Sequence, residues 1–243
     1  MLTLVFPMSL EIPGLVNKRK SRWIKDNTCQ CLVIGVGKES TQKVLAKWRE
    51  DNSHIADPHI GENRILLLGF CGGLDPSLRA GDMVLSTHYS LDQRLSHAHL
   101  YRQCEPNLNM LFQAVNVITK KEMRWSLAPS LTTTHIVGTR VEKAKVRESC
   151  NAGTVNMEDF WVADFARQWN IPFLSVRVVV DEAAQEISSN VLELPLAPWK
   201  VLPFVLSRPN QLVRLTSLMI KMAVAKRKLS IFAGAFLAST KDQ

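Results

Sequence analysis

The sequence predicts a single α/β domain whose sheet is mixed, mostly parallel and flanked by helices. Short apolar runs typical of buried strands alternate with stretches of helical period along most of the chain. The clearest unit spans 155–182, where Met157, Trp161 and Phe165 mark one helical face and a dense apolar run follows at 173–180. A strand so apolar is covered on both faces, which is typical of parallel sheets. These observations favour repeated strand–helix units around one sheet.

The other elements follow the same alternation. Asn170 and Pro172 end the helix of the 155–182 unit, and three glycines within 69–73 predict a tight turn after a buried strand. In chain order, the remaining predicted elements are a strand at 31–36, a helix at 39–50, strands at 65–68 and 83–86, an irregular hairpin at 88–104, a helix at 107–120, a strand at 130–137, and helices at 142–149 and 211–237.

Three regions can be separated along the chain. Residues 1–28 are apolar first and basic second, the reverse of a signal peptide, and we expect a mobile N-terminal arm or an alternative start site. Residues 29–190 are expected to form the α/β domain. Residues 191–243 are expected to form a proline-rich segment and a basic amphipathic helix that packs on the domain or on a membrane surface.

Charge and cysteine content narrow the classes of partner. The 243-residue chain has a net charge of +8 and a pI near 9.4, which favours an anionic partner such as a membrane surface, nucleic acid or phosphate. Its basic residues are not interleaved with stacking aromatic residues, so nucleic-acid binding is not expected. The five cysteines lack a disulfide or zinc spacing, which is typical of reduced thiols in a cytoplasmic protein. No histidine spacing predicts a metal, and no uncharged apolar run reaches the roughly 18 residues of a membrane span.

Two carboxylates bracket the 155–182 unit. Asp181 follows the strand, at the sheet edge where open α/β sheets bind ligands. Glu158 lies in the first helical turn, where the helix dipole favours negative charge. The local pattern leaves two interpretations open. Either the two carboxylates belong to a ligand site, or Glu158 is only an N-terminal helix charge and Asp181 only a turn residue.

Three segments resemble the nucleoside phosphorylase and nucleosidase superfamily. They are GFCGGLDPSLRAGDMVLS at 69–86, VNME at 155–158 and IPFLSVRVVVDEA at 171–183, in the family's order and spacing. The resemblance implies a three-layer αβα fold of the nucleoside phosphorylase type and cleavage of a purine–ribose bond. It also implies a homo-oligomer and no cofactor, with phosphate as a co-substrate in the phosphorolytic branch.

The resemblance also implies roles for individual residues. Asp181 would protonate N7 of the departing purine, and Glu158 would hold the ribose hydroxyls and stabilise positive charge on the sugar. Arg177 matches a family position and could equally be structural. The implied substrate-binding residues are Gly69, Phe70, Cys71, Gly72, Gly73, Asn156, Met157 and Phe160.

The resemblance does not extend to the site of the attacking nucleophile, because the phosphate ligands of one phosphorolytic branch are absent. Leu67 and Phe70 replace an Arg and a Ser of that branch, and Val180 replaces the usual Ser before the catalytic Asp. Either water attacks the sugar, or phosphate is bound differently. The candidates for this site are Gly35, Lys38, Glu39, Ser40 and Arg140.

The C-terminal stretch suggests a substrate. Residues 200–228 contain seven basic residues and no acidic one, interleaved with apolar residues, and resemble the tail of hopanoid-associated phosphorylases. This implies adenine release from a lipid-linked nucleoside such as adenosylhopane, at the inner face of an anionic membrane. The alternatives are a soluble enzyme for a small purine nucleoside such as methylthioadenosine, and a noncatalytic nucleoside- or membrane-binding relative.

Overall fold

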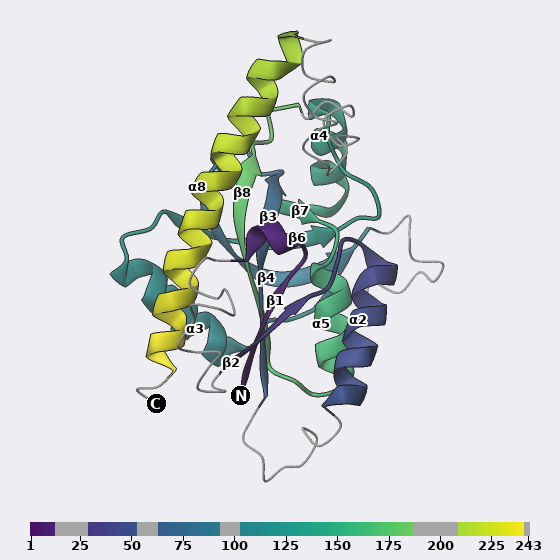
Figure 1. Cartoon of the computed structure of the whole chain (residues 1–243). Coiled ribbons are helices and arrows are strands. Elements are labelled where there is room, and N and C mark those ends of the chain that lie inside the picture. Colours follow the sequence, from purple (N-terminus) through teal and green to yellow (C-terminus); the bar gives the residue numbers. More distant parts are fainter. Residues whose placement is uncertain (13–28, 53–62, 93–102, 187–208, 241–243) are drawn as a thin grey trace.

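The computed structural model describes residues 1–12, 29–52, 63–92, 103–186 and 209–240, and it contains one mixed sheet between two helical layers (Figure 1). The helices are the short 3₁₀ helix η1 (Ser9–Glu11), α2 (Lys38–Asp51), α3 (Leu108–Lys120), α4 (Arg140–Cys150), α5 (Asp159–Gln168) and α8 (Pro209–Ser239). The strands are β1 (Leu2–Phe6), β2 (Cys29–Val33), β3 (Arg64–Gly73), β4 (Met83–Leu91), β5 (Gln103–Cys104), β6 (Trp125–Thr132), β7 (Thr154–Asn156) and β8 (Phe173–Asp181).

The sheet confirms the predicted mixed α/β class. Parallel pairs join β1 to β2 and β3, β3 to β8, β4 to β6, and β6 to β7. Antiparallel pairs join β3 to β7, β4 to β8 and β4 to β5. Strands β3, β8, β4, β6 and β7 therefore pair in a closed ring, with β1 and β2 extending the sheet from β3.

Two apolar clusters hold the helices against the sheet. Helices α3 and α8 cover one face, where Leu229, Phe232 and Phe236 of α8 are buried among side chains from β1, β3, β4 and β8. Helices α2 and α5 cover the other face, where Leu45 and Phe160 lie in the second cluster. Within the parts of the chain that the structure describes, no helix is long and apolar enough to cross a bilayer.

The prediction of a mobile N-terminal arm is wrong for its first residues. All five residues of β1 are buried, and the strand pairs with β2 on one side and β3 on the other. The apolar run that we interpreted as an arm is thus an internal strand of the sheet. Residues 13–28 of the predicted arm lie outside the described residues.

The predicted glycine turn is also wrong, because β3 continues as a strand through Gly73. Gly69 pairs with Arg177, and after an irregularity beyond Cys71, Gly72 pairs with Asp181. Two neighbouring strands supply hydrogen-bond partners for this backbone, so the weak strand preference of glycine is overridden. The prediction that Asn170 ends α5 is confirmed, since Asn170 has a φ of +51°, a left-handed conformation that Asn tolerates.

Candidate active site

The candidate site lies where β3 and β8 approach their carboxyl ends. There η1 and α5 contact the strands, and α4 reaches the end of β8 through a side-chain hydrogen bond. The register places Gly69 beside Arg177 and Gly72 beside Asp181. Three residues of strand span roughly 10 Å, so the site has two ends, separated by a length comparable with that of a purine nucleoside.

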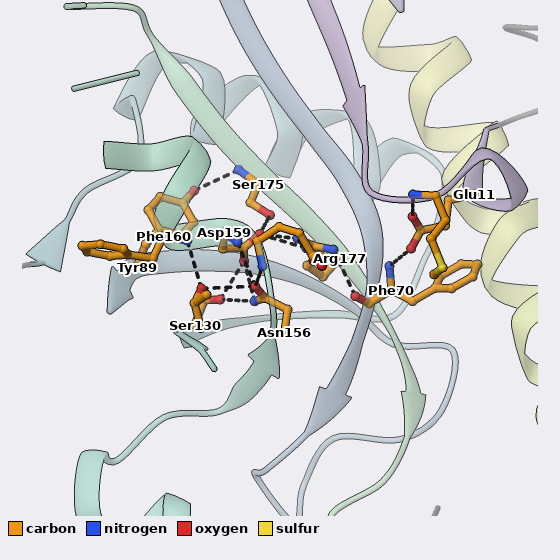
Figure 2. A network of polar contacts seen from close by, with 12 residues as sticks. Glu11, Phe70, Tyr89, Ser130, Asn156, Asp159, Phe160, Ser175 and Arg177 are labelled. Carbon is orange, nitrogen blue, oxygen red and sulfur yellow. Dashed lines mark hydrogen bonds and ion pairs between the residues drawn. The ribbon is translucent and has the colours of Figure 1, made fainter. Parts of the chain in front are cut away.

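Arg177 organises the first end (Figure 2). Its side chain is 1% exposed, and its Nε and Nη2 donate to Oδ1 of Asp159 at 2.9 and 2.6 Å. Nη2 also donates to Oε2 of Glu158 at 3.3 Å, and Nη1 donates to the carbonyl oxygen of Phe70 at 3.1 Å. Arg177 was predicted to match a family position or to be structural. In the structure its guanidinium joins the side chains of Glu158 and Asp159 and the carbonyl group of Phe70.

Asp159 is locked by three further donors. The Ser130 hydroxyl and the Asn156 amide donate to Oδ2 at 2.6 and 2.9 Å, and the Ser175 hydroxyl donates to Oδ1 at 2.7 Å. Asn156 also accepts hydrogen bonds from the backbone N–H groups of Glu158 and Asp159 at 3.0 and 2.8 Å. Asn156, predicted to bind substrate, therefore fastens the start of α5, as Asn side chains do at turns and helix ends.

Glu158 is buried at the same end. Its Oε1 accepts a hydrogen bond from the backbone N–H of Gly37 at 3.4 Å, which brings the β2–α2 loop to the carboxylate. Burial raises the pKa of Glu158, while the neighbouring Arg177 lowers it and Asp159 raises it further. The predicted carboxylate therefore lies in a charged interior cluster, at the residue that precedes α5.

Glu11 is the functional candidate that the sequence analysis missed. Its side chain is 1% exposed and accepts hydrogen bonds from the backbone N–H groups of Phe70 and Met8 at 2.9 and 2.8 Å (Figure 2). Burial raises the pKa of Glu11 to about 7, against the opposing effect of Arg177. A carboxyl group that titrates near neutrality is suited to accept a proton during a reaction. A Glu shortly after an apolar strand was the available signal, but it required recognising β1.

Three of the five residues predicted for the nucleophile have other side-chain contacts in the structure. The Ser40 hydroxyl donates to the carbonyl oxygen of Ile34 at 2.7 Å, next to Gly35, which has a φ of +77°. The Lys38 ammonium lies 5.1 Å from the ring centre of Trp161. The remaining two are Glu39, which is exposed in the first turn of α2, and Arg140, which donates to the carbonyl oxygen of Ala184.

Asp181 lies at the second end, 5% exposed at the end of β8. Its Oδ2 accepts a hydrogen bond from the ammonium group of Lys143, a residue of α4 that the sequence analysis did not select. Burial raises the pKa of Asp181, and Lys143 and Lys221 lower it. Val180 replaces the usual Ser and has no hydroxyl group to donate to Asp181. The carboxylate instead accepts its hydrogen bond from Lys143.

The other predicted residues divide between the site and the core. A Cβ atom on Gly72 would lie 3.2 Å from the Asp181 carboxylate, so the absence of a side chain lets this carboxylate lie close to the backbone of β3. Met157 is half-buried beside Glu158. Cys71 packs with Val179, and burial raises the pKa of its thiol. Phe160 is buried in the apolar cluster that also contains Leu45 and Trp48 of α2. Among the described residues, no group of His, Cys, Asp or Glu side chains has an arrangement that could hold a metal ion.

A family model described as "Phosphorylase superfamily" matches residues 26–195. The chain belongs to the phosphorylase superfamily. This agrees with the resemblance of the glycine-rich, VNME and IPFLSVRVVVDEA segments. No curated protein sequence matches the chain.

Several solved structures share this fold at low sequence identity. Futalosine hydrolase of Helicobacter pylori strain 26695 has a TM-score of 0.68 at 13% identity, covering 98% of this chain and 97% of that one. The 5′-methylthioadenosine/S-adenosylhomocysteine nucleosidase of Neisseria meningitidis, in complex with methylthio-immucillin-A, has a TM-score of 0.67 at 14% identity, covering 98% of each chain. The corresponding nucleosidase of Colwellia psychrerythraea 34H, in complex with adenine, has a TM-score of 0.66 at 14% identity and covers 98% and 94%.

Gly69→Ala should destabilise the protein by about 1–3 kcal/mol, the usual cost of overpacking a close-packed site. A Cβ atom at Gly69 would lie 2.4 Å from Nη1 of Arg177 and 3.1 Å from Oε1 of Glu11. At Gly73, on the same strand, the nearest atoms lie at 3.3 Å, so Gly73→Ala is the comparison variant. Urea unfolding measures both, and an equal loss in the two variants would contradict a specific clash with Arg177.

Proposed function

We propose that this protein hydrolyses the N-glycosidic bond of an adenine nucleoside and releases adenine. The observation that carries this proposal is a buried carboxyl group at each end of the Gly69–Gly73 segment, Glu11 at one end and Asp181 at the other. Cleavage of this bond needs a base for the nucleophile and an acid for the departing purine. In this proposal the nucleoside extends from one carboxyl group to the other.

The proposed reaction assigns one task to each carboxyl group. Glu11 takes a proton from water, whose oxygen attacks C1′ of the ribose. Glu158 binds the ribose hydroxyls and stabilises the positive charge that develops on the sugar. The C1′–N9 bond breaks, its electron pair moves to the base, and Asp181 gives its proton to N7. Protonation makes the purine a better leaving group, and the products are adenine and the free sugar.

Charge at the first end favours water over phosphate. Within the described residues, Arg177 there faces Glu11, Glu158 and Asp159, and its hydrogen bonds go to the two latter carboxylates and to Phe70. A phosphate dianion would meet three acidic side chains and a guanidinium that is already paired. The fold similarity to proteins named as nucleosidases and a hydrolase also supports hydrolysis. Phosphorolysis remains the second candidate.

The test is adenine release measured with phosphate and after its removal. The panel comprises adenosine, 5′-methylthioadenosine, S-adenosylhomocysteine and futalosine. We expect free adenine from at least one adenine nucleoside in phosphate-free buffer. Release that requires phosphate would identify a phosphorylase. No base release from any member, with or without phosphate, would contradict catalysis and favour a noncatalytic nucleoside-binding protein.

We further propose that α8 contacts an anionic membrane at its cytoplasmic face and that the nucleoside is lipid-linked, as in adenosylhopane. One face of α8 exposes Met219, Ile220 and Val224 together with the basic Arg227, a combination that suits an interfacial helix.

Flotation with anionic and with neutral liposomes tests this contact. We expect binding to the anionic vesicles alone, weakened by Ile220→Asp. If neither vesicle binds, covering of this face by a second copy in a homo-oligomer is the alternative, which sedimentation measures.

A further inference from the structure

Lys143 on α4 has no role in the reaction proposed above, yet its side chain is 1% exposed and touches the Asp181 carboxylate. Its Nζ also donates to the carbonyl oxygens of Glu182 and Gln185, at 2.8 and 3.1 Å. An ammonium group has three donors. All three are used on the end of β8 and the turn that follows it.

The other charged groups near Asp181 act less directly. Lys221 of α8 lowers the pKa of Asp181, and its Nζ donates to the side chain of Gln185 at 2.7 Å. Glu182 accepts a hydrogen bond from the backbone N–H of Ala80 and faces Arg79. Cys71 on β3 is a buried thiol whose raised pKa keeps it neutral. Among the described residues, Lys143 is the cation whose hydrogen bond to Asp181 the structure records.

A buried Lys–Asp pair needs an explanation beyond stability. Lys side chains are almost never fully buried unless they are paired, and a buried ion pair often stabilises a fold no more than apolar residues of similar size. A catalytic acid has two opposing requirements, because it must hold its proton in the resting site and release it to the base. Burial of Asp181 serves the first requirement, and a fixed cation on the opposite oxygen serves the second.

We propose that Lys143 is a positioning residue of the acid step: it orients the Asp181 carboxyl group and stabilises the carboxylate that remains once the proton has moved to N7. This inference rests on the proposed function. Lys143 keeps its three protons throughout. The proton leaves Asp181, the electron pair of the C1′–N9 bond goes to the purine, and the new negative charge on Asp181 lies against the Lys143 ammonium.

Lys143→Met should lower kcat for adenine release from 5′-methylthioadenosine by about 100-fold, the order expected for general acid catalysis. The loss should be much smaller with p-nitrophenyl β-D-riboside, whose leaving group needs no proton. The alkaline limb of the pH–rate profile should move to higher pH, because Asp181 without its cation holds its proton longer. Asp181→Asn should show the same difference between the two substrates. Lys145→Met is the control, since Lys145 is exposed on the same helix.

Equal losses on both substrates, with an unchanged alkaline limb, would show that Lys143 only supports the fold and would overturn the inference. Lys143→Gln keeps an N–H donor for the backbone carbonyls while removing the charge, and it replaces the Met variant if that one does not fold. Absence of adenine release from the unmodified protein would instead contradict the proposed function. Adenine release that is insensitive to loss of the Lys143 charge would contradict this inference alone.

Discussion

Glu11→Gln should lower kcat/KM for adenine release by about 10²- to 10⁴-fold, the usual contribution of a general base. Gln has nearly the same shape but cannot accept the proton of the attacking water. The raised pKa of Glu11, about 7, gives the sign of the pH dependence. The base acts as a carboxylate, so the rate of the unmodified protein should rise with pH through about 7 and become constant above it, until loss of the acid lowers it.

Glu39→Gln provides the comparison for Glu11, because Glu39 is the acidic residue that the sequence placed near the nucleophile. In the structure it is exposed in the first turn of α2, so its replacement should change kcat/KM by less than about twofold. A pH–rate profile for both variants would complete the measurement. A large loss in Glu39→Gln with an active Glu11→Gln would contradict our assignment of the base and restore the one made from the sequence.

The sequence predicts the parts of the site that lie within one local unit. Glu158 and Asp181 belong to a helix followed by a strand, and both signals, the helical stripe and the apolar run, are contained in 155–182. The structure places both carboxyl groups inside the protein. The position of Asp181 follows from local pattern, because a parallel strand delivers its last residues to one known edge of the sheet. The roles of Asp181 and Glu158 came from the family resemblance, since the local pattern left a structural interpretation open.

The residues that were missed depend on contacts between distant segments. Glu11 could not be placed, because nothing local shows that Leu2–Phe6 pairs with a strand some sixty residues further on. Lys143 and Lys145 are alike in a basic helical stretch, and only packing buries the first and exposes the second. Asp159 adjoins the VNME segment, yet its importance appears only when Arg177 is seen across from it. Long-range pairing and burial decide these positions.

Arg177→Met should lower the free energy of unfolding by about 3–5 kcal/mol, because it removes one partner from a buried charge cluster. Glu158 and Asp159 would lose their ion pairs, and Glu11 would lose the nearby positive charge. Arg147→Met is the matched control. Arg147 pairs with Asp75 with both side chains 32% exposed, and such a pair contributes about 0–1 kcal/mol.

The loss in Arg177→Met should also depend on pH. Without the guanidinium, the pKa values of Glu11 and Glu158 in the folded protein rise further above those of the unfolded chain. The folded state then binds more protons than the unfolded one. Stability therefore falls as pH rises from the pKa values of the unfolded chain through those of the folded protein, and it recovers partly toward acid pH. Urea unfolding at pH 5 and pH 8 measures the effect. A loss no larger than that of Arg147→Met, equal at both values, would mean that the cluster tolerates its acidic groups without Arg177.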